Sequence, residues 1–593
     1  MRQFFKFVFA SCLGVILASF VVTAIMFAVF GAISSAVSTD DTADVKPNTV
    51  LAIDFTQAIP EKTNNLPVNP FDFQNNKILG LQEILDQIKK ASEDDDIKAI
   101  YLNLSGMTGN QVTSRKIRQA LADFKASGKK VIAYSHYYPQ ATYYLASVAD
   151  QIYVNPIGAV EFQGYGVILA FFKDMLDKLG IEMQVFYAGQ FKSATEPFRM
   201  NEMSDQNRLQ IKEYMEDLYD IFLDDVAASR GITKDSLKAI AEGYLSRDAE
   251  SSKALGLIDD IKYEDEVRSE LKAIVGIEEN DDLNSISLQE YAKGPAKTGE
   301  YGKGDKIAVV YAEGEINDGI ETAGQINGDN YVKILRKIRE DDKVKALVLR
   351  VNSGGGSVLA SDRILREIQL IKDKGIPVVT SMGDVAASGG YYIACNSNKI
   401  FAEPNTITGS IGVFGILPSV QKLFNDKLGI HFDTVQTQKY STAFTPFFKL
   451  KDSEFAILQN SVDKTYDRFL TLVAKGRSMT KEEVHAVAQG RVWSGRKAKE
   501  IGLVDELGGL EQAIAAAAAL AELKDYRTTD YPRIKDPMQQ FIEQITGADD
   551  GEAIRQTMMK RELGDMYGFY TCVKQMKDMK GPQARLPFML YAE

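Results

Sequence analysis

The stretch VKALVLRVNSGGG, residues 344–356, has the pattern of a buried strand followed by a glycine turn. A similar stretch, IKAIYLNLSGMTG, occupies residues 97–109. An amphipathic helical pattern precedes each stretch, and a second helical pattern and another apolar run follow it. Strands that alternate with helices predict parallel pairing through right-handed crossovers, with helices on both faces of the sheet. The sequence therefore predicts an α/β fold.

The same order of elements occurs twice along the chain. Residues 131–156 match residues 378–404, with Tyr143 aligned to Tyr391 at a shift of 248 positions. LGLID, which ends at 259, and IGLVD, which ends at 505, are related by a shift of 246. Such steady shifts indicate a duplicated domain. The boundaries that we expect are 45–290 for the N-terminal repeat, 291–306 for the linker, 307–540 for the C-terminal repeat and 541–593 for a tail that matches neither copy.

Composition narrows the range of partners. The 593 residues carry a formal net charge of −12 and contain no long basic run. Nucleic acid is therefore not an expected partner, because phosphate binding needs clustered Lys and Arg. Cys12, Cys395 and Cys572 have no metal-ligand spacing, so we expect no metal and no other cofactor.

The N-terminus predicts a membrane anchor. Residues 7–37 contain no charged side chain, and a bilayer-spanning helix needs about 20 apolar residues. Basic residues precede this span and Asp40 follows it. The positive-inside rule therefore leaves residues 1–6 as a cytoplasmic stub and the bulk of the chain outside the cytoplasm. The end of the span at residues 36–38 also resembles a cleavage site, so a removable signal peptide is the alternative.

The two repeats differ around one serine. Ser388 aligns with Gln140, and the two glycines that follow it align with Ala141 and Thr142. NSGGGS in the second copy likewise stands against SGMTGN in the first. Only the second copy thus combines a hydroxyl with neighbouring glycines, whose lack of a side chain lets another molecule approach the backbone closely.

The opposite difference concerns a lysine. Alignment of VFYAGQFKSATEPF, residues 185–198, with TVQTQKYSTAFTPF, residues 434–447, places Lys192 opposite Ser441. If the repeats pack around a pseudo-twofold axis, Lys192 and Ser388 share a site. A serine hydroxyl becomes an effective nucleophile only when a neighbouring base removes its proton.

Lysine is the predicted base in place of histidine. None of His136, His431 and His485 lies in a turn with an evident carboxylate partner. A lysine acts as a base when it is neutral, and burial without a carboxylate partner lowers its pKa. We therefore expect Glu196, which is near Lys192 in the sequence, to point elsewhere.

The glycines have a predicted role in the same chemistry. Attack by Ser388 on a carbonyl creates an oxyanion, which backbone N–H groups stabilise by several kcal/mol. Gly355, after its strand, and Gly389, next to Ser388, are the expected donors. The start of a helix after Ser388 would also favour negative charge there.

These motifs resemble those of the signal peptide peptidase A family, also called protease IV, in its long duplicated form. The matching pieces are RVNSGGGSVLASD (350–362), GDVAASGGYYIAC (383–395), TGSIGVFG (408–415) and YAGQFKSATEPF (187–198). One departure is that the family often has Ser-Pro-Gly-Gly where this chain has four residues reading SGGG from 353 to 356. That change loosens the turn and keeps the N–H donors.

The resemblance implies two tandem copies of a crotonase- and Clp-protease-like ββα-type domain behind one N-terminal transmembrane helix. It implies that Ser388 is the nucleophile, that Lys192 is the general base and that the hydroxyl of Ser410, in TGSIG, orients the lysine amine. It also implies a homotetramer, anchored in the inner membrane with its catalytic region on the periplasmic side. The implied substrates are signal peptides left after secretion, cut after small or apolar residues.

Two other functions fit parts of the pattern. A crotonase-type acyl-thioester enzyme uses the same kind of glycine oxyanion hole but needs neither Lys192 nor an anchor. A catalytically inactive membrane-anchored scaffold would lose nothing when Ser388 is replaced. Considered alone, a serine in a glycine-rich turn, such as Ser388, is more often structural than catalytic. A single lysine, such as Lys192, is usually a solvent-exposed side chain. The reciprocal difference between the repeats favours the protease.

Overall fold

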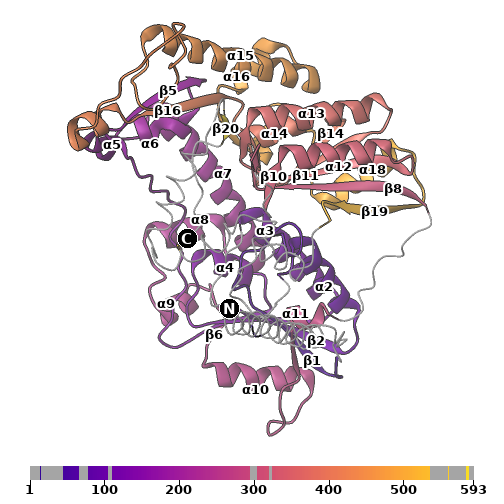
Figure 1. Ribbon diagram of the computed structural model, residues 1–593. Helices are drawn as coiled ribbons and strands as arrows, with labels where there is room; N and C mark the ends of the chain where they lie inside the picture. Colours follow the sequence, from indigo (N-terminus) through magenta and orange to yellow (C-terminus); the bar gives the residue numbers. More distant parts are fainter. Residues whose placement is uncertain are drawn as a thin grey trace, which may run out of the picture.

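The computed structural model describes residues 45–65, 78–104, 110–293, 304–319, 324–533 and 583–585, together with the single positions 14 and 559 (Figure 1). Apart from position 14, the anchor predicted at residues 7–37 lies outside the described residues. Within the described part of the chain, each helix is too short or too polar to cross a bilayer.

The N-terminal repeat is built on a six-stranded parallel sheet in the order β6-β4-β3-β2-β1-β7. Helices α2 and α3 contribute Ile88 and Leu121 to a core with Leu102 on one face, and α10 contributes Leu271 to a core with Tyr101 on the other. The elements are β1 (Thr49–Ile53), α2 (Leu81–Glu93), β2 (Ile97–Asn103), α3 (Gln111–Ala126), β3 (Lys130–Ser135), α4 (Gln140–Ala146), β4 (Gln151–Val154), β6 (Asp260–Ile261), α10 (Glu264–Val275), β7 (Ser285–Ser287) and α11 (Leu288–Tyr291).

The C-terminal repeat has the same plan, and its main path runs β17-β15-β13-β11-β8-β19. Helices α12 and α13 cover one face, and α18 covers the other. The elements are β8 (Asp305–Glu313), α12 (Gly328–Glu340), β11 (Val344–Ser353), α13 (Val358–Asp373), β13 (Val378–Ala387), α14 (Gly389–Ala394), β14 (Lys399–Ala402), β15 (Ile407–Gly409), β17 (Val492–Ser494), α17 (Gly495–Glu500), β18 (Glu506–Leu507), α18 (Leu510–Leu520) and β19 (Tyr526–Tyr531). The predicted α/β fold with a repeated order of elements is confirmed.

A third sheet contains strands from both repeats and from the C-terminal tail, in the order β10-β9-β12-β20-β16-β5. Strand β5 belongs by sequence to the first repeat, yet it pairs antiparallel with β16 of the second over seven residue pairs, from Glu182–Ser419 to Ala188–Val413. Its strands are β5 (Glu182–Ala188), β9 (Glu315–Asn317), β10 (Gln325–Asn327), β12 (Gly355–Ser357), β16 (Val413–Ser419) and β20 (Gln583–Arg585). The tail that we could not assign to either copy thus supplies a strand, β20, next to β12.

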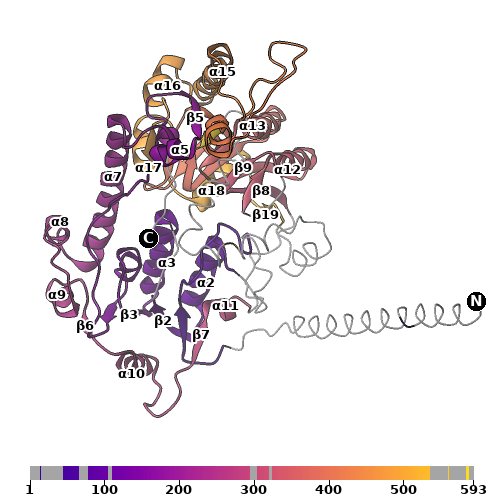
Figure 2. The same cartoon turned by 60° about the vertical axis from the view of Figure 1, so that its left-hand side comes forward.

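Long helices cover and connect these sheets. Helix α7 (Asp205–Arg230) runs from the third sheet back to the first repeat, and α15 (Asp452–Arg477) lies over β5 and β16 (Figures 1 and 2). The remaining elements are α5 (Lys173–Leu179), η1 (Ser193–Thr195), α6 (Glu196–Arg199), α8 (Lys234–Glu242), α9 (Ala249–Ala254), η2 (Leu423–Leu428) and α16 (Lys481–Val487).

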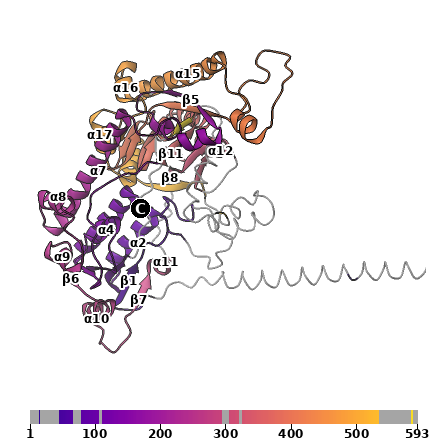
Figure 3. The same ribbon diagram turned by 90° about the vertical axis from the view of Figure 1, so that its left-hand side faces the viewer.

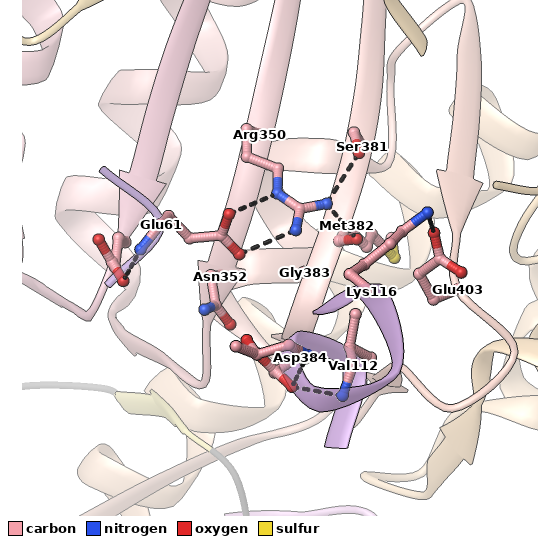
Figure 4. Close-up of polar contacts among 12 residues, drawn as sticks. Glu61, Val112, Lys116, Arg350, Asn352, Ser381, Met382, Gly383, Asp384 and Glu403 are labelled. Carbon is pink, nitrogen blue, oxygen red and sulfur yellow. Dashed lines mark hydrogen bonds and ion pairs between the residues drawn. The ribbon is translucent and has the colours of Figure 1, made fainter. Parts of the chain in front are cut away.

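Buried charges hold the two repeats together beside β13 (Figure 4). The guanidinium of Arg350 donates two hydrogen bonds of 2.9 Å to the carboxylate of Glu61 and one of 2.8 Å to the carbonyl oxygen of Met382. Both charged side chains are almost fully buried. Glu61 precedes α2 of the N-terminal repeat, and Arg350 lies on β11 of the C-terminal repeat. This pair therefore joins the two repeats through their interior.

A second contact ties β13 directly to the first repeat. The carboxylate of Asp384 accepts hydrogen bonds from the backbone N–H of Val112 at 2.7 Å and from the hydroxyl of Thr113 at 2.7 Å. These residues begin α3, so a strand of one repeat caps a helix of the other. The end of β13 that carries Ser388 is therefore anchored against the N-terminal repeat.

Replacing Arg350 by Met is expected to lower the free energy of unfolding by about 3–5 kcal/mol, because the carboxylate of Glu61 stays buried without its partner. Denaturant unfolding measures this loss. The matched control is Lys374→Met, which breaks the exposed pair between Lys374 and Asp342 and should cost less than about 1 kcal/mol. Equal losses in the two variants would contradict a structural role for the buried pair.

Candidate active site

Three predicted site residues from distant parts of the sequence meet in one place. The Nζ of Lys192 lies 2.9 Å from the Oγ of Ser388 and 2.9 Å from the Oγ of Ser410. An N–H of the same amine donates to the carbonyl oxygen of Ser410 at 3.2 Å. Ser388 lies between β13 and α14, Ser410 directly follows β15, and Lys192 directly precedes η1. The β5–β16 pairing brings the lysine to the second repeat.

The backbone presents Ser388 in an unusual conformation. Its φ of 56° and ψ of −114° lie outside the regions that L residues commonly adopt, and the cost of such a conformation is about 1–3 kcal/mol. The N–H of Ser388 donates to the carbonyl oxygen of Gly409 at 2.9 Å, which fixes the turn. Ser410 also has a positive φ, of 49°, and its N–H donates to the carbonyl oxygen of Arg491 at 2.7 Å. Both serines are therefore held by their main chains, and their hydroxyls are left to face the amine.

Burial shifts the pKa of Lys192. The side chain is only 1% exposed, and this desolvation lowers the pKa of Lys192 well below its ordinary value of 10.5. The carboxylate of Glu196 accepts hydrogen bonds from the hydroxyl of Ser204 at 2.6 Å and from the amide of Asn207 at 2.8 Å. As expected, Glu196 thus has partners other than Lys192. When the amine is neutral, its N–H groups can remain on Ser410 and its lone pair is free to accept the proton of Ser388.

The two predicted oxyanion donors lie side by side. A Cβ placed on Gly355, whose φ is +98°, would lie 2.6 Å from the backbone nitrogen of Gly389. The N–H of Gly355 donates to the Oγ of Ser353 at 3.1 Å, so it must exchange this partner to reach a substrate oxygen. Gly390 has a packing role that the sequence did not reveal, since a Cβ there would lie 2.5 Å from the carbonyl oxygen of Ser353.

A loop that the sequence analysis did not single out positions the lysine. Gly490, with a φ of +80°, leaves room for Lys192, because a Cβ at this glycine would lie 2.6 Å from the Cβ of Lys192. The neighbouring residue Gln489 accepts the N–H of Phe191 through its carbonyl oxygen at 2.9 Å. From the other side, the buried amide of Gln210, on α7, donates to the carbonyl oxygen of Phe191 at 3.0 Å. The dipeptide Gln489-Gly490 was the only local signal, and it indicates no more than a turn.

The histidines take part in other contacts. His136 lies 3.3 Å from the hydroxyl of Tyr134, and His485 lies 3.0 Å from the hydroxyl of Tyr466. His431 is in an exposed stretch after η2. None of these contacts involves Lys192, Ser388 or Ser410.

Comparison with known proteins gives the class of protein. The family model described as Peptidase family S49 matches residues 123–278 and 371–524, one segment in each repeat. The chain therefore belongs to peptidase family S49, with two tandem copies of the domain, and it is a serine peptidase. This membership favours the protease over the acyl-thioester enzyme and the inactive scaffold.

Curated relatives identify the group within the family. Protease 4 of Salmonella typhi is 38% identical over 478 residues, which cover 79% of this chain and 76% of the relative. Protease 4 of Haemophilus influenzae is 37% identical, covering 74% of this chain and 72% of the relative. The chloroplastic serine protease SPPA of Arabidopsis thaliana is 33% identical, covering 76% and 67% respectively. The resemblance to signal peptide peptidase A, or protease IV, is thus confirmed.

A solved structure also matches, at a much lower level. A point mutant of ClpP1 from Listeria monocytogenes is 20% identical, with a TM-score of 0.24, over 35% of this chain and 94% of that chain. A score in this range carries no argument, so the crotonase- and Clp-like form of each repeat stays a prediction.

Replacing Gly490 by Ala is expected to lower peptidase activity about 100-fold, because the added methyl group displaces Lys192 and a shift of about 1 Å costs that much. The matched control is Gly502→Ala. Gly502 has the same φ of +80°, but the atom nearest to its added Cβ is the sulfur of Met479 at 3.9 Å. The two variants share the backbone strain and differ in the contact. Equal activities, measured on one peptide substrate, would contradict the positioning role.

Proposed function

We propose that the chain is a membrane-anchored serine endopeptidase whose nucleophile is Ser388 and whose general base is Lys192. The observation that carries the proposal is the 2.9 Å approach of a buried amine to the Oγ of Ser388, with no carboxylate among the amine's hydrogen-bond partners in the described part of the chain. Ser410 orients the amine through its hydroxyl and its carbonyl oxygen. The proposed reaction uses these side chains and main-chain donors alone.

The reaction proceeds in two stages. The Oγ of Ser388 attacks the peptide carbonyl carbon while its proton passes to the Nζ of Lys192, and the resulting oxyanion accepts hydrogen bonds from the N–H groups of Gly389 and Gly355. Lys192 then gives the proton to the leaving amine, and the ester on Ser388 remains. A water molecule, deprotonated by Lys192, attacks this ester, the bond to the Oγ of Ser388 breaks, and Lys192 returns the proton to that oxygen, which restores the free serine and the neutral amine.

Strand β20 supports the binding of an extended peptide beside the serine. Its residues Gln583–Arg585 pair antiparallel with β12, the strand that carries Gly355. Ala584 is fully buried there, and its carbonyl oxygen would lie 2.0 Å from a Cβ added to Gly355. A substrate that adds to β12 in the same way would bring a carbonyl to the proposed oxyanion donors and a small side chain into the buried position.

The biological setting follows from the resemblance and from the N-terminal sequence. A relative from Enterococcus faecium, 38% identical over 38% of this chain, is named putative signal peptide peptidase SppA. We propose signal peptides left after secretion as the substrates and a single-pass anchor at residues 7–37 in the inner membrane. The catalytic region then faces the periplasm, and the assembly is a homotetramer.

Replacing Lys192 by Met is expected to lower kcat/KM for peptide hydrolysis by about 10²–10⁴-fold, because the general base is lost. Ser388→Ala should abolish labelling of the protein by a fluorophosphonate as well as hydrolysis. Lys173→Met is the control, since Lys173 is a partly exposed lysine on α5. Unchanged hydrolysis in Lys192→Met would refute the proposed base.

The pH dependence of stability is expected to report the neutral amine independently of activity. Between the lowered pKa of folded Lys192 and about 10.5, the unfolded chain binds one proton that the folded chain does not, so this lysine makes the free energy of unfolding rise with pH by up to about 1.4 kcal/mol per unit. Denaturant unfolding of the parent chain and of Lys192→Met at several pH values between about 7 and 10 measures it. The same slope in both proteins would show that Lys192 is charged when folded.

A further inference from the structure

Strand β20 shows where the side chains of a strand bound to β12 lie. Ala584 lies opposite Gly356 in the antiparallel pairing, and Arg585 lies opposite Gly355. Successive side chains of a strand point to opposite faces of the sheet, so Ala584 and Arg585 enter different surroundings. Ala584 is fully buried, whereas the side chain of Arg585 keeps contact with solvent and is 15% exposed. The two positions can therefore select for different properties of a bound peptide.

A carboxylate lies across β12 from Arg585. Strand β9 pairs parallel with β12 on its other side, where Ile316 is next to Gly356. The preceding residues of these two strands, Glu315 and Gly355, are therefore neighbours as well. The guanidinium of Arg585 forms an ion pair with the carboxylate of Glu315. A cation on the bound strand thus reaches over β12 to an acid on β9.

The glycine between the two charges leaves the path open. Two steps between neighbouring strands span about 9–10 Å, and a long side chain crosses that distance most easily where the middle strand has no side chain. A Cβ added to Gly355 would lie 2.0 Å from the carbonyl oxygen of Ala584, so β20 could not keep its place. Gly355, an expected oxyanion donor, thus also leaves Glu315 within reach of the bound strand.

Two further carboxylates near β12 have partners of their own. Asp318 accepts a hydrogen bond from the hydroxyl of Ser357 and lies 4.0 Å from the guanidinium of Arg363. Asp329 pairs with the same guanidinium. Helix α10, whose first turn carries three carboxylates, lies at the end of the molecule opposite β5 of the third sheet (Figures 1 and 3). Exposed charges that far away are screened by salt, so Glu315 is the carboxylate that a cation at this position meets.

We propose that Glu315 is a specificity-determining residue, which selects peptides with a basic side chain directly after the small buried residue. The inference rests on the proposed function, because it takes a peptide substrate to add to β12 as β20 does. Arginine suits the position best, since a guanidinium can form two parallel hydrogen bonds to a carboxylate, whereas a lysine acts as a point charge. An acidic residue at this position would meet a like charge and be disfavoured.

Peptides that differ only in the residue after a single alanine test the preference. With Arg, Met or Glu at that position, the full-length chain should hydrolyse the Arg peptide with a kcat/KM about tenfold above that of the Met peptide, and the Glu peptide most slowly. The matched control peptide has the same composition, but its Arg is one residue further along and points to the opposite face. The net charge of −12 attracts both Arg peptides alike, so equal rates for these two would overturn the inference.

Substitutions test the role of Glu315 itself. Glu315→Gln should make the kcat/KM values of the Arg and Met peptides equal, and Glu315→Lys should make the Glu peptide the preferred one. Asp329→Asn is the matched control, because it removes a carboxylate of the same repeat and should keep the tenfold ratio. Ratios are compared within each protein, so a changed affinity for β20 affects all peptides alike. An unchanged ratio in Glu315→Gln, or its loss in Asp329→Asn, would contradict the assignment.

A binding measurement separates this inference from the proposed chemistry. Fluorescence anisotropy of labelled Arg and Glu peptides gives their affinities for Ser388→Ala, which should still bind the Arg peptide more tightly. Equal affinities would overturn the role of Glu315 and leave the assignment of Ser388 and Lys192 intact. Hydrolysis that persists in Ser388→Ala would overturn that assignment, whereas a preference for the Arg peptide in binding would still support the role of Glu315.

Discussion

The structure depends on one interaction, the contact between the buried amine of Lys192 and the hydroxyl of Ser388. The base that we propose, Lys192, must be uncharged to accept a proton, and its burial lowers its pKa in that direction. For this reason it matters that the carboxylate of Glu196 accepts its hydrogen bonds from Ser204 and Asn207. It also matters that backbone hydrogen bonds hold Ser388 and Ser410 in place. A carboxylate in contact with the amine would raise the pKa of Lys192 again.

Duplication explains how such a site is divided between two similar halves. The segment that carries Lys192 leaves the core of its own repeat, crosses as β5 and joins β16 of the other. The repeats then need a fixed relation to one another, since a movement between them would separate Lys192 from Ser388. Buried polar contacts next to β13, through Arg350 and Asp384, supply that relation close to Ser388. Buried ionic contacts add less stability than apolar packing would, but they accept only one alignment.

The sequence predicted the α/β order, the duplication and the residues that meet, because these follow from periodicity and from differences between aligned copies. It did not predict the exchange of β5, since VFYA reads as a strand whichever sheet receives it. The sequence also did not predict the roles of Gly490 and Gln210 in positioning Lys192. A glycine in a turn and a glutamine on a helix are common, and their importance arises from distances of 2.6 Å and 3.0 Å to residues far away in the sequence. Asp384 looked like part of the motif around Ser388, whereas its carboxylate caps a helix of the other repeat.

The short strand β20 pairs with β12, so it competes with any free peptide that would pair with β12 in the same way. Residues 583–585 are tethered, and a tethered segment acts at an effective concentration of the order of millimolar. A free peptide present at about one micromolar must therefore bind β12 about 10³-fold more tightly than β20 does in order to replace β20 half of the time. A peptide that binds β12 weakly therefore leaves β20 in place.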